Sequence, residues 1–107
     1  FPAEYLTHAW YKFYAYLDLK KLREGWNRDK IIATINKQGF PAFSGSCSEI
    51  YLEKCFANKG IKPNKELINA QELGKTSLMF LVHPTINKNQ MEKYAHSIKK
   101  VILKALK

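Results

Sequence analysis

The sequence predicts an α+β domain in which about three strands form a small sheet that packs with about four helices. Three observations carry this prediction. An apolar run from Leu78 to Val82 lies between Gly74 and Pro84, too little room for a helix, which is typical of a core strand covered on both faces. Residues 8–19 alternate at the period of a strand. Other segments carry helix caps and apolar spacings of three and four residues.

The first predicted strand, residues 8–19, has two faces that differ in polarity. Alternate positions on one side are apolar: Ala9, Tyr11, Phe13, Ala15, Leu17 and Leu19. The other side mixes aromatic, basic and acidic residues: Trp10, Lys12, Tyr14, Tyr16 and Asp18. We expect the first side to meet the core and the second to meet a wetter layer or another domain. Aromatic rings beside a lysine could also stack on nucleic-acid bases, which leaves that alternative open.

A helix and a short strand are predicted next. Asn27 is the predicted N-cap of the helix, Asp29 lies in its first turn, and Gly39 suits the left-handed position after its end. Its predicted buried stripe consists of Ile31, Ile32 and Ile35. Extended backbone is predicted over residues 40–43, where Pro41 indicates an edge strand or a strand start.

The turn that follows this strand is the candidate binding site. Its residues are Ser44, Gly45, Ser46 and Cys47. Ser46 and Glu49 have the spacing of a capping box, so a helix is predicted to begin here and to run through Phe56. A small-residue turn that opens into a helix N-terminus leaves free backbone N–H groups, where anions and polar ligands can bind.

Two more helices and their caps complete the pattern. One is predicted from an N-cap at Asn64 to Gly74, and the other follows Asn87 and Gln90, which again have cap spacing. The second helix has a predicted apolar stripe: Met91, Ala95, Ile98, Val101 or Ile102, and Ala105. Its opposite face carries lysines: Lys88, Lys93, Lys100, Lys104 and Lys107. The predicted order is β-α-β-α-α-β-α without an internal repeat.

Length and composition indicate one globular domain over residues 1–107, with 46% hydrophobic and 25% charged residues. No apolar run approaches the roughly 20 residues that cross a bilayer, and no signal-peptide pattern is present. The formal charge of +9 comes from 18 basic and 9 acidic residues. Because the lysines are dispersed, a solvated surface is favoured, and a basic α+β interaction or nucleic-acid-binding module remains the alternative.

The residue types that carry catalysis or metal binding do not cluster in the sequence. Cys47 and Cys55 are eight positions apart, about 12 Å along a helix, which is too far for a disulfide and predicts two reduced cysteines in a cytosolic protein. His8, His83 and His96 stand alone. No nucleophile elbow, phosphate-binding loop or zinc motif is present, so the sequence does not predict a self-contained enzyme.

Several blocks resemble the C-terminal small domain of the DegT/DnrJ/StrS family of PLP-dependent nucleotide-sugar aminotransferases, which have fold type I. The likeness rests on His-Ala-Trp-Tyr-Lys at 8–12, Gly-Phe-Pro at 39–41 and Phe-Ser-Gly-Ser-Cys-Ser-Glu-Ile-Tyr at 43–51. It continues with Pro63, Ala-Gln-Glu-Leu-Gly at 70–74 and Ser-Leu-Met-Phe-Leu-Val-His-Pro at 77–84. The blocks span nearly the whole chain, and the last two together are fairly specific.

The resemblance implies a cytoplasmic, homodimeric enzyme that transfers an amino group, usually from glutamate, to a nucleotide-linked keto sugar. In that family the Schiff-base lysine, the aspartate beside the pyridine nitrogen and the phosphate-binding residues belong to the large N-terminal domain. We therefore expect a fragment without that domain, which holds no PLP and is inactive alone. The turn at residues 44–47 would line the substrate cleft. Many relatives carry His-Tyr-type residues near this turn, and their absence here leaves the sugar preference open.

Overall fold

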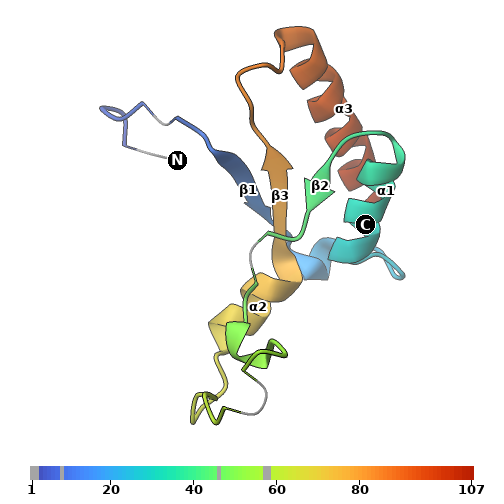
Figure 1. Cartoon of the computed structure of the whole chain (residues 1–107). Coiled ribbons are helices and arrows are strands. Elements are labelled where there is room, and N and C mark those ends of the chain that lie inside the picture. The colour runs from blue at the N-terminus through green and yellow to red at the C-terminus, as the bar shows by residue number, and fades with distance from the viewer. Residues whose placement is uncertain (1–2, 8, 46, 57–58) are drawn as a thin grey trace.

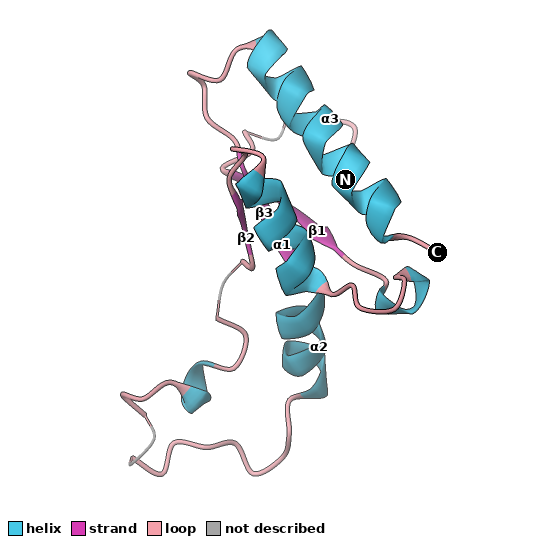
Figure 2. Ribbon diagram, turned by 90° about the vertical axis from the view of Figure 1, so that its right-hand side faces the viewer, coloured by secondary structure: helices cyan, strands magenta, loops and turns pink. Residues whose placement is uncertain are grey.

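The computed structural model describes residues 3–7, 9–45, 47–56 and 59–107, and it confirms the α+β fold class. Within these residues it contains three strands, three α-helices and two 3₁₀ turns (Figures 1 and 2). In chain order the elements are β1 (Lys12–Tyr16), η1 (Leu19–Lys21), α1 (Arg28–Lys37), β2 (Ala42–Phe43), η2 (Ile50–Leu52), α2 (Ile68–Thr76), β3 (Ser77–Leu81) and α3 (Lys88–Ala105).

The predicted apolar strand, β3, is the centre of the sheet. The strand order is β1-β3-β2, and both outer strands run antiparallel to β3. Leu78 and Phe80 lie on one face of β3, which α1 and α3 cover (Figure 2). Around them lies a single buried cluster, which also contains Leu22, Ile31, Ile35, Ala42, Tyr94, Val101 and Ala105. Ile32 packs against this cluster, so the predicted stripe of α1 is confirmed.

In the described part of the chain, helices pack on one face of β3, whereas residues of both faces are buried from Ser77 to Phe80, as predicted. Met79 belongs to the other face, yet it is only 8% exposed. Its register partners across the two ladders are Tyr14 and Phe43, and these large side chains flank it on both sides. Side-chain neighbours within a three-stranded sheet therefore bury the central residue, while the outer residues of this open face stay accessible.

The first strand is shorter than the predicted 8–19, since β1 spans only Lys12–Tyr16. Within β1 the alternation is confirmed, because Ala15 packs against the core cluster and Tyr14 lies on the open face. Trp10 precedes the strand, and its ring lies 5.4 Å from that of Phe13, a residue of the covered face. Trp10 therefore lies outside β1, and the alternation predicted for residues 8–19 does not give the side on which its ring lies. Asp18 instead caps η1, and His8 lies outside the described residues.

The caps predicted for α1 and α3 are confirmed. The Asn27 side chain accepts a hydrogen bond from the Lys30 backbone N–H at 2.8 Å, and Gly39 has a φ of 85°. Asn87 and Gln90 form a complete capping box at the start of α3. These bonds satisfy N–H groups that would otherwise lack a partner at each helix start.

The buried face of α3 overlaps the predicted stripe in part, because Val101 and Ala105 are buried and Ile98 and Ile102 pack against the core cluster. This buried face consists of Tyr94, Ser97, Val101 and Ala105, whereas Met91 and Ala95 are exposed. Tyr94 donates its hydroxyl hydrogen bond to the Pro41 carbonyl, and Ser97 bonds Gln38 Oε1 at 2.7 Å. Polar tips that find partners allow tyrosine and serine to enter the core. The predicted stripe did not include these two residues, whose hydroxyl groups need partners that the sequence pattern does not show.

The helix predicted to begin at Ser46 and to run to Phe56 is wrong, because the described residues 47–56 contain only the three-residue turn η2. Ile50 is 60% exposed and Leu52 is 59% exposed, so neither packs against a core that would hold a helix. Glu49 precedes η2 without a side-chain capping bond, and Ser46 lies outside the described residues.

The helix predicted from Asn64 to Gly74 is displaced along the chain. It begins at Ile68, and its N-cap is Leu67, which makes no side-chain capping bond. It passes Gly74, ends at Thr76 and continues directly into β3 (Figure 1). We call the sheet with α1 and α3 the sheet body, and the described residues of 44–76 the α2 lobe. In the described residues, no helix is long and apolar enough to cross a membrane.

Candidate functional site

The predicted turn is anchored to the start of β3. Ser44 follows β2, and its carbonyl accepts a hydrogen bond from Ser77 Oγ at 2.6 Å. Gly45 has a φ of 86°, the left-handed region. A Cβ at Gly45 would lie 3.1 Å from Tyr14 Cε1 and 3.3 Å from Ser77 Oγ. Both the backbone conformation and the close approach to the open sheet face therefore require glycine here.

A pocket of about 270 Å³ lies beside this turn, between the open sheet face and α2. It is lined by Tyr14, Tyr16, Cys47, Ser48, Ala70, Leu73 and Ser77. Of the predicted site residues, Cys47 forms part of the wall, and Gly45 adjoins it through Tyr14 and Ser77. The wall combines aromatic rings with hydroxyl groups and carries no charged residue. Such a lining suits a neutral polar ligand, with hydroxyls for hydrogen bonds and rings for apolar faces.

Tyr14 and Tyr16 are the site residues that sequence reasoning missed. They were assigned to the correct strand face, but as a contact surface for another domain. Tyr14 is 38% exposed and Tyr16 is 61% exposed, so both present surface for contact. The period of β1 placed them on one face, but it carried no signal that this face borders the predicted turn. Only the tertiary fold brings that face to residues 44–48.

The thiol of Cys47 is held in its protonated form. It donates a hydrogen bond to Glu53 Oε1 at 3.2 Å, and this bond, together with desolvation and the negative charge of Glu53, raises the pKa of Cys47. A thiolate is the nucleophilic form of cysteine, so this environment opposes nucleophilic catalysis. Cys47 and Cys55 are both exposed free thiols, as expected for reduced cysteines.

The helix N-terminus that was the basis for an anion site after the turn is absent from the described residues 47–56, where η2 is only three residues long. Glu49 instead accepts a hydrogen bond from the Tyr51 hydroxyl at 2.5 Å. That bond, with desolvation and the neighbouring carboxylate charges, raises the pKa of Tyr51 to about 12. This part of the α2 lobe therefore presents carboxylates rather than free N–H donors.

Gly74 determines how closely the turn can approach α2. A Cβ on Gly74 would overlap Ser48 Oγ, so the absence of a side chain lets residue 48 pack on the helix. The Gly74 carbonyl accepts a hydrogen bond from Arg28 Nη1 at the start of α1. Arg28 also forms an ion pair with Asp29 at 2.8 Å. Gly74, within α2, thus lies next to Ser48 of the pocket wall and is hydrogen-bonded to Arg28 of the sheet body.

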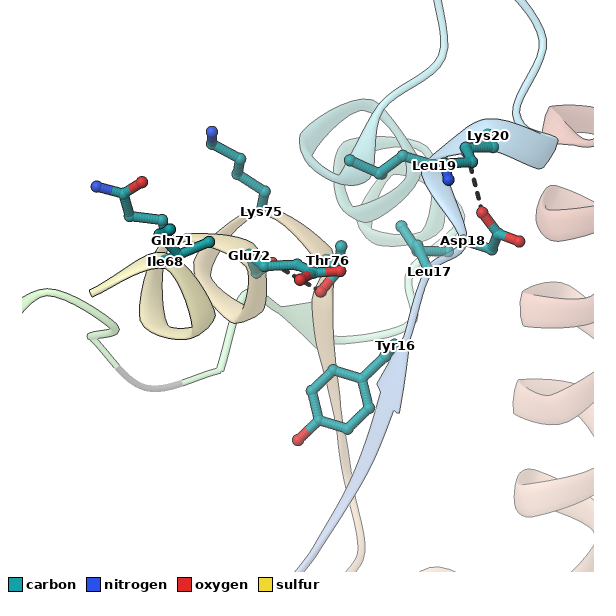
Figure 3. A pocket seen from close by; sticks show the side chains of 10 residues that line it. All are labelled: Tyr16, Leu17, Asp18, Leu19, Lys20, Ile68, Gln71, Glu72, Lys75 and Thr76. Atoms are coloured by element: carbon teal, nitrogen blue, oxygen red, sulfur yellow. Dashed lines mark hydrogen bonds between the residues drawn. The ribbon is translucent and has the colours of Figure 1, made fainter. Parts of the chain in front are cut away.

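A second, more open hollow of about 610 Å³ lies between the end of β1 and α2 (Figure 3). Tyr16 borders this hollow as well as the smaller pocket. The polar residues that line the larger hollow include Asp18, Lys20, Glu72 and Lys75. The Asp18 carboxylate accepts a hydrogen bond from the Lys20 backbone N–H, as the dashed line in Figure 3 shows. The two hollows form an accessible surface on either side of Tyr16.

Neither hollow has the features of a resident cofactor or metal site. Among its described lining residues the small pocket has no lysine or arginine, so these residues offer neither a Schiff-base amine nor a cationic phosphate partner. Lys20 and Lys75 border the larger hollow, but both are exposed. No group of three histidine, cysteine, aspartate or glutamate residues that could hold a metal occurs in the described parts of the chain.

Comparison with known proteins assigns the chain to a class: it is similar, over nearly its whole length, to part of an aminotransferase. The similar protein is the aminotransferase from Psychrobacter cryohalolentis, known from an X-ray structure. The two share 47% sequence identity with a TM-score of 0.85. The match covers 92% of this chain and 25% of that chain, so this chain spans about a quarter of the similar protein. No protein-family model and no curated protein sequence matches this chain.

Proposed function

We propose that this chain is the C-terminal small domain of a PLP-dependent aminotransferase that acts on nucleotide-linked keto sugars. The similarity to a quarter of an aminotransferase, at 47% identity, is the observation that carries this proposal. The resemblance of residues 39–51 and 70–84 to the DegT/DnrJ/StrS family supplies the substrate class. The proposed location is the cytoplasm, and the proposed assembly is a homodimer of the complete enzyme.

In this proposal the cofactor chemistry belongs to a large N-terminal domain. That domain would supply the lysine for PLP, the partner of the pyridine nitrogen and the phosphate cradle. The small domain would form one wall of the substrate cleft with Ser44, Gly45, Ser46 and Cys47. The neutral lining beside Gly45 supports this role, because sugar hydroxyls pair with hydroxyl groups and sugar faces pack on aromatic rings. The chain alone would then be inactive.

A chimera tests this assignment. In the Psychrobacter cryohalolentis aminotransferase, this chain would replace the quarter that it matches, and amino transfer would be measured with the substrates of that enzyme. We expect a soluble chimera that retains PLP and transfers the amino group from glutamate. A folded chimera that binds PLP but catalyses neither half-reaction would contradict the assignment.

The isolated chain provides a second test. Titration with PLP should produce no stoichiometric absorbance of a Schiff base in the visible range, because no lysine here lies in the sequence context of the family's Schiff-base lysine. Borohydride treatment followed by peptide mapping would identify any trapped lysine. Stoichiometric trapping at one lysine would show that the small domain holds the cofactor by itself.

A further inference from the structure

An apolar groove lies on the sheet body, away from the candidate site. It has a volume of about 470 Å³ and runs between the β1–β3 edge and α3. Its walls are almost entirely apolar and include Phe13, Leu81, Val82, Met91, Ala95 and Ile98. Part of the stripe predicted for α3 from the sequence lines this groove, namely Met91, Ala95 and Ile98, of which Ile98 also packs against the core cluster.

The groove reaches the core of the domain. Phe80 and Tyr94 are 6% and 5% exposed, and both belong to the core cluster as well as to the groove wall. Their rings meet edge to face at a centroid distance of 6.1 Å. Water in this groove contacts apolar surface beside the core, which favours a covering element.

The charges beside the groove indicate which kind of partner could cover it. Lys99 lines the groove, and α3 as a whole carries five lysines and one glutamate. That glutamate, Glu92, already lies 3.9 Å from the Lys88 ammonium group. A second copy of this chain would bring another Lys99 and a second chain of formal charge +9 against the first, which like-charge repulsion disfavours. A bilayer would need protruding apolar side chains, whereas these line a hollow.

We propose that this groove binds an amphipathic helix whose apolar stripe is flanked by acidic residues. Such a helix would insert its stripe between Phe13 and α3 and place its carboxylates near Lys99, the lysine that lines the groove. The source that we assign is the part of the parent polypeptide that this chain lacks, since the similar aminotransferase is about four times as long. The assignment of the source therefore rests on the proposed function, whereas the chemistry of the groove does not.

The first experiment tests the chemistry with the chain alone. The probe is a fluorescent designed peptide of about 14 residues, roughly 20 Å of helix, with leucines at helical spacing between two rows of glutamates. Its matched control carries lysines in place of the glutamates. We expect saturable binding of the glutamate peptide that weakens with salt, and at least about tenfold weaker binding of the lysine peptide. Equal binding of both peptides, or binding of neither, would overturn the proposal.

Two substitutions of matched exposure locate the binding site. Leu103 lines the groove and is 58% exposed, whereas Leu52 lies in η2 and is 59% exposed. We expect Leu103→Glu to weaken binding of the glutamate peptide about tenfold and Leu52→Glu to leave it unchanged. Circular dichroism would verify that both variants are folded. Equal effects of the two variants would place the peptide elsewhere and contradict the proposal.

The second experiment tests the source with the chimera described above. If a helix of the larger polypeptide occupies the groove, Leu103→Glu should lower the Tm of the chimera by more than it lowers the Tm of the isolated chain. Equal shifts would overturn the assigned source, as would self-association or binding to anionic vesicles that Leu103→Glu abolishes. A chimera that lacks activity but shows the larger Tm shift would contradict the proposed function and leave the groove assignment supported.

Discussion

The sheet body and the α2 lobe differ in how they bury apolar side chains. Every hydrophobic residue that is buried in the described chain lies outside the α2 lobe, and all but Leu22 belong to the sheet body. The α2 lobe exposes several large apolar residues, among them Ile50, Leu52, Ile61, Ile68 and Leu73. The lobe nevertheless supplies much of the pocket wall. The region proposed to line the substrate cleft is therefore supported by the sheet body rather than by a core of its own.

The largest effect expected from this difference is on global stability. Ile35 is fully buried, so Ile35→Ala should lower the free energy of unfolding by about 2–5 kcal/mol. Ile50→Ala, in the lobe, should change it by no more than about 0.5 kcal/mol, because Ile50 is 60% exposed. Urea unfolding followed by circular dichroism would measure both. A comparable loss in the two variants would show that the lobe has a core of its own.

A smaller, local effect is expected at Gly74. A Cβ there overlaps Ser48 Oγ, so Gly74→Ala should force residues 47–56 away from α2 at a cost of about 1–3 kcal/mol. Amide hydrogen exchange should then accelerate in the lobe and remain unchanged in α1 and α3. Ser48→Gly removes the overlapping atoms and should restore slow exchange in the double variant. Faster exchange throughout the chain would instead indicate that Gly74 stabilises the whole domain.

The same difference explains what sequence reasoning achieved. It identified β3 and α1 from an apolar run and a stripe of isoleucines, which pack in the core. It identified the starts of α1 and α3 from side-chain caps, which depend on residues three positions apart. It failed in the lobe, where Ser46 and Glu49 have the spacing of a cap but no core stabilises a helix behind them. It also ended a helix at Gly74, because a glycine that permits close packing with Ser48 resembles a glycine that ends a helix.

The candidate site was predictable in part. The turn at residues 44–47 was recognised from its small residues and from a family resemblance. Tyr14 and Tyr16 were not connected with it, since about thirty positions separate them and only the pairing of β1 and β2 with β3 brings them together. Tyr94 and Ser97 were not predicted on the buried face of α3, because both are buried through hydrogen bonds that a hydrophobic pattern does not contain.

The open sheet face provides a test of moderate size. Tyr16 is 61% exposed beside both hollows, so Tyr16→Lys should leave the Tm nearly unchanged and reduce binding of an apolar dye. Trp10→Lys should be more destabilising, because the Trp10 ring contacts Phe13 at a centroid distance of 5.4 Å. Thermal unfolding and dye titration of both variants would measure this difference. A greater loss of stability in Tyr16→Lys would reverse the assignment of these two residues.

The smallest effect is a titration within the lobe. Tyr51 should ionise at a pH of about 12, above the usual value of about 10, because its hydroxyl donates to Glu49. The folded state holds this proton more tightly, so the contribution to stability is present below about pH 10 and is lost as the pH rises to about 12. Absorbance at alkaline pH, compared with Glu49→Gln, would measure the shift. An unchanged titration in Glu49→Gln would exclude this hydrogen bond as the cause.

The most direct test of the α2 lobe as the substrate wall separates the two half-reactions in the chimera. Gly45→Val would place a branched side chain against Tyr14 and Ser77, whereas Gly39→Val has a similar φ, 85° against 86°, with nothing within 4 Å of its Cβ. We expect Gly45→Val to slow the half-reaction with the nucleotide-linked keto sugar about tenfold or more and to leave the glutamate half-reaction within about twofold. Gly39→Val should not distinguish between the half-reactions. Equal losses of both half-reactions in Gly45→Val would contradict a substrate-lining role and indicate a turn that only supports the fold.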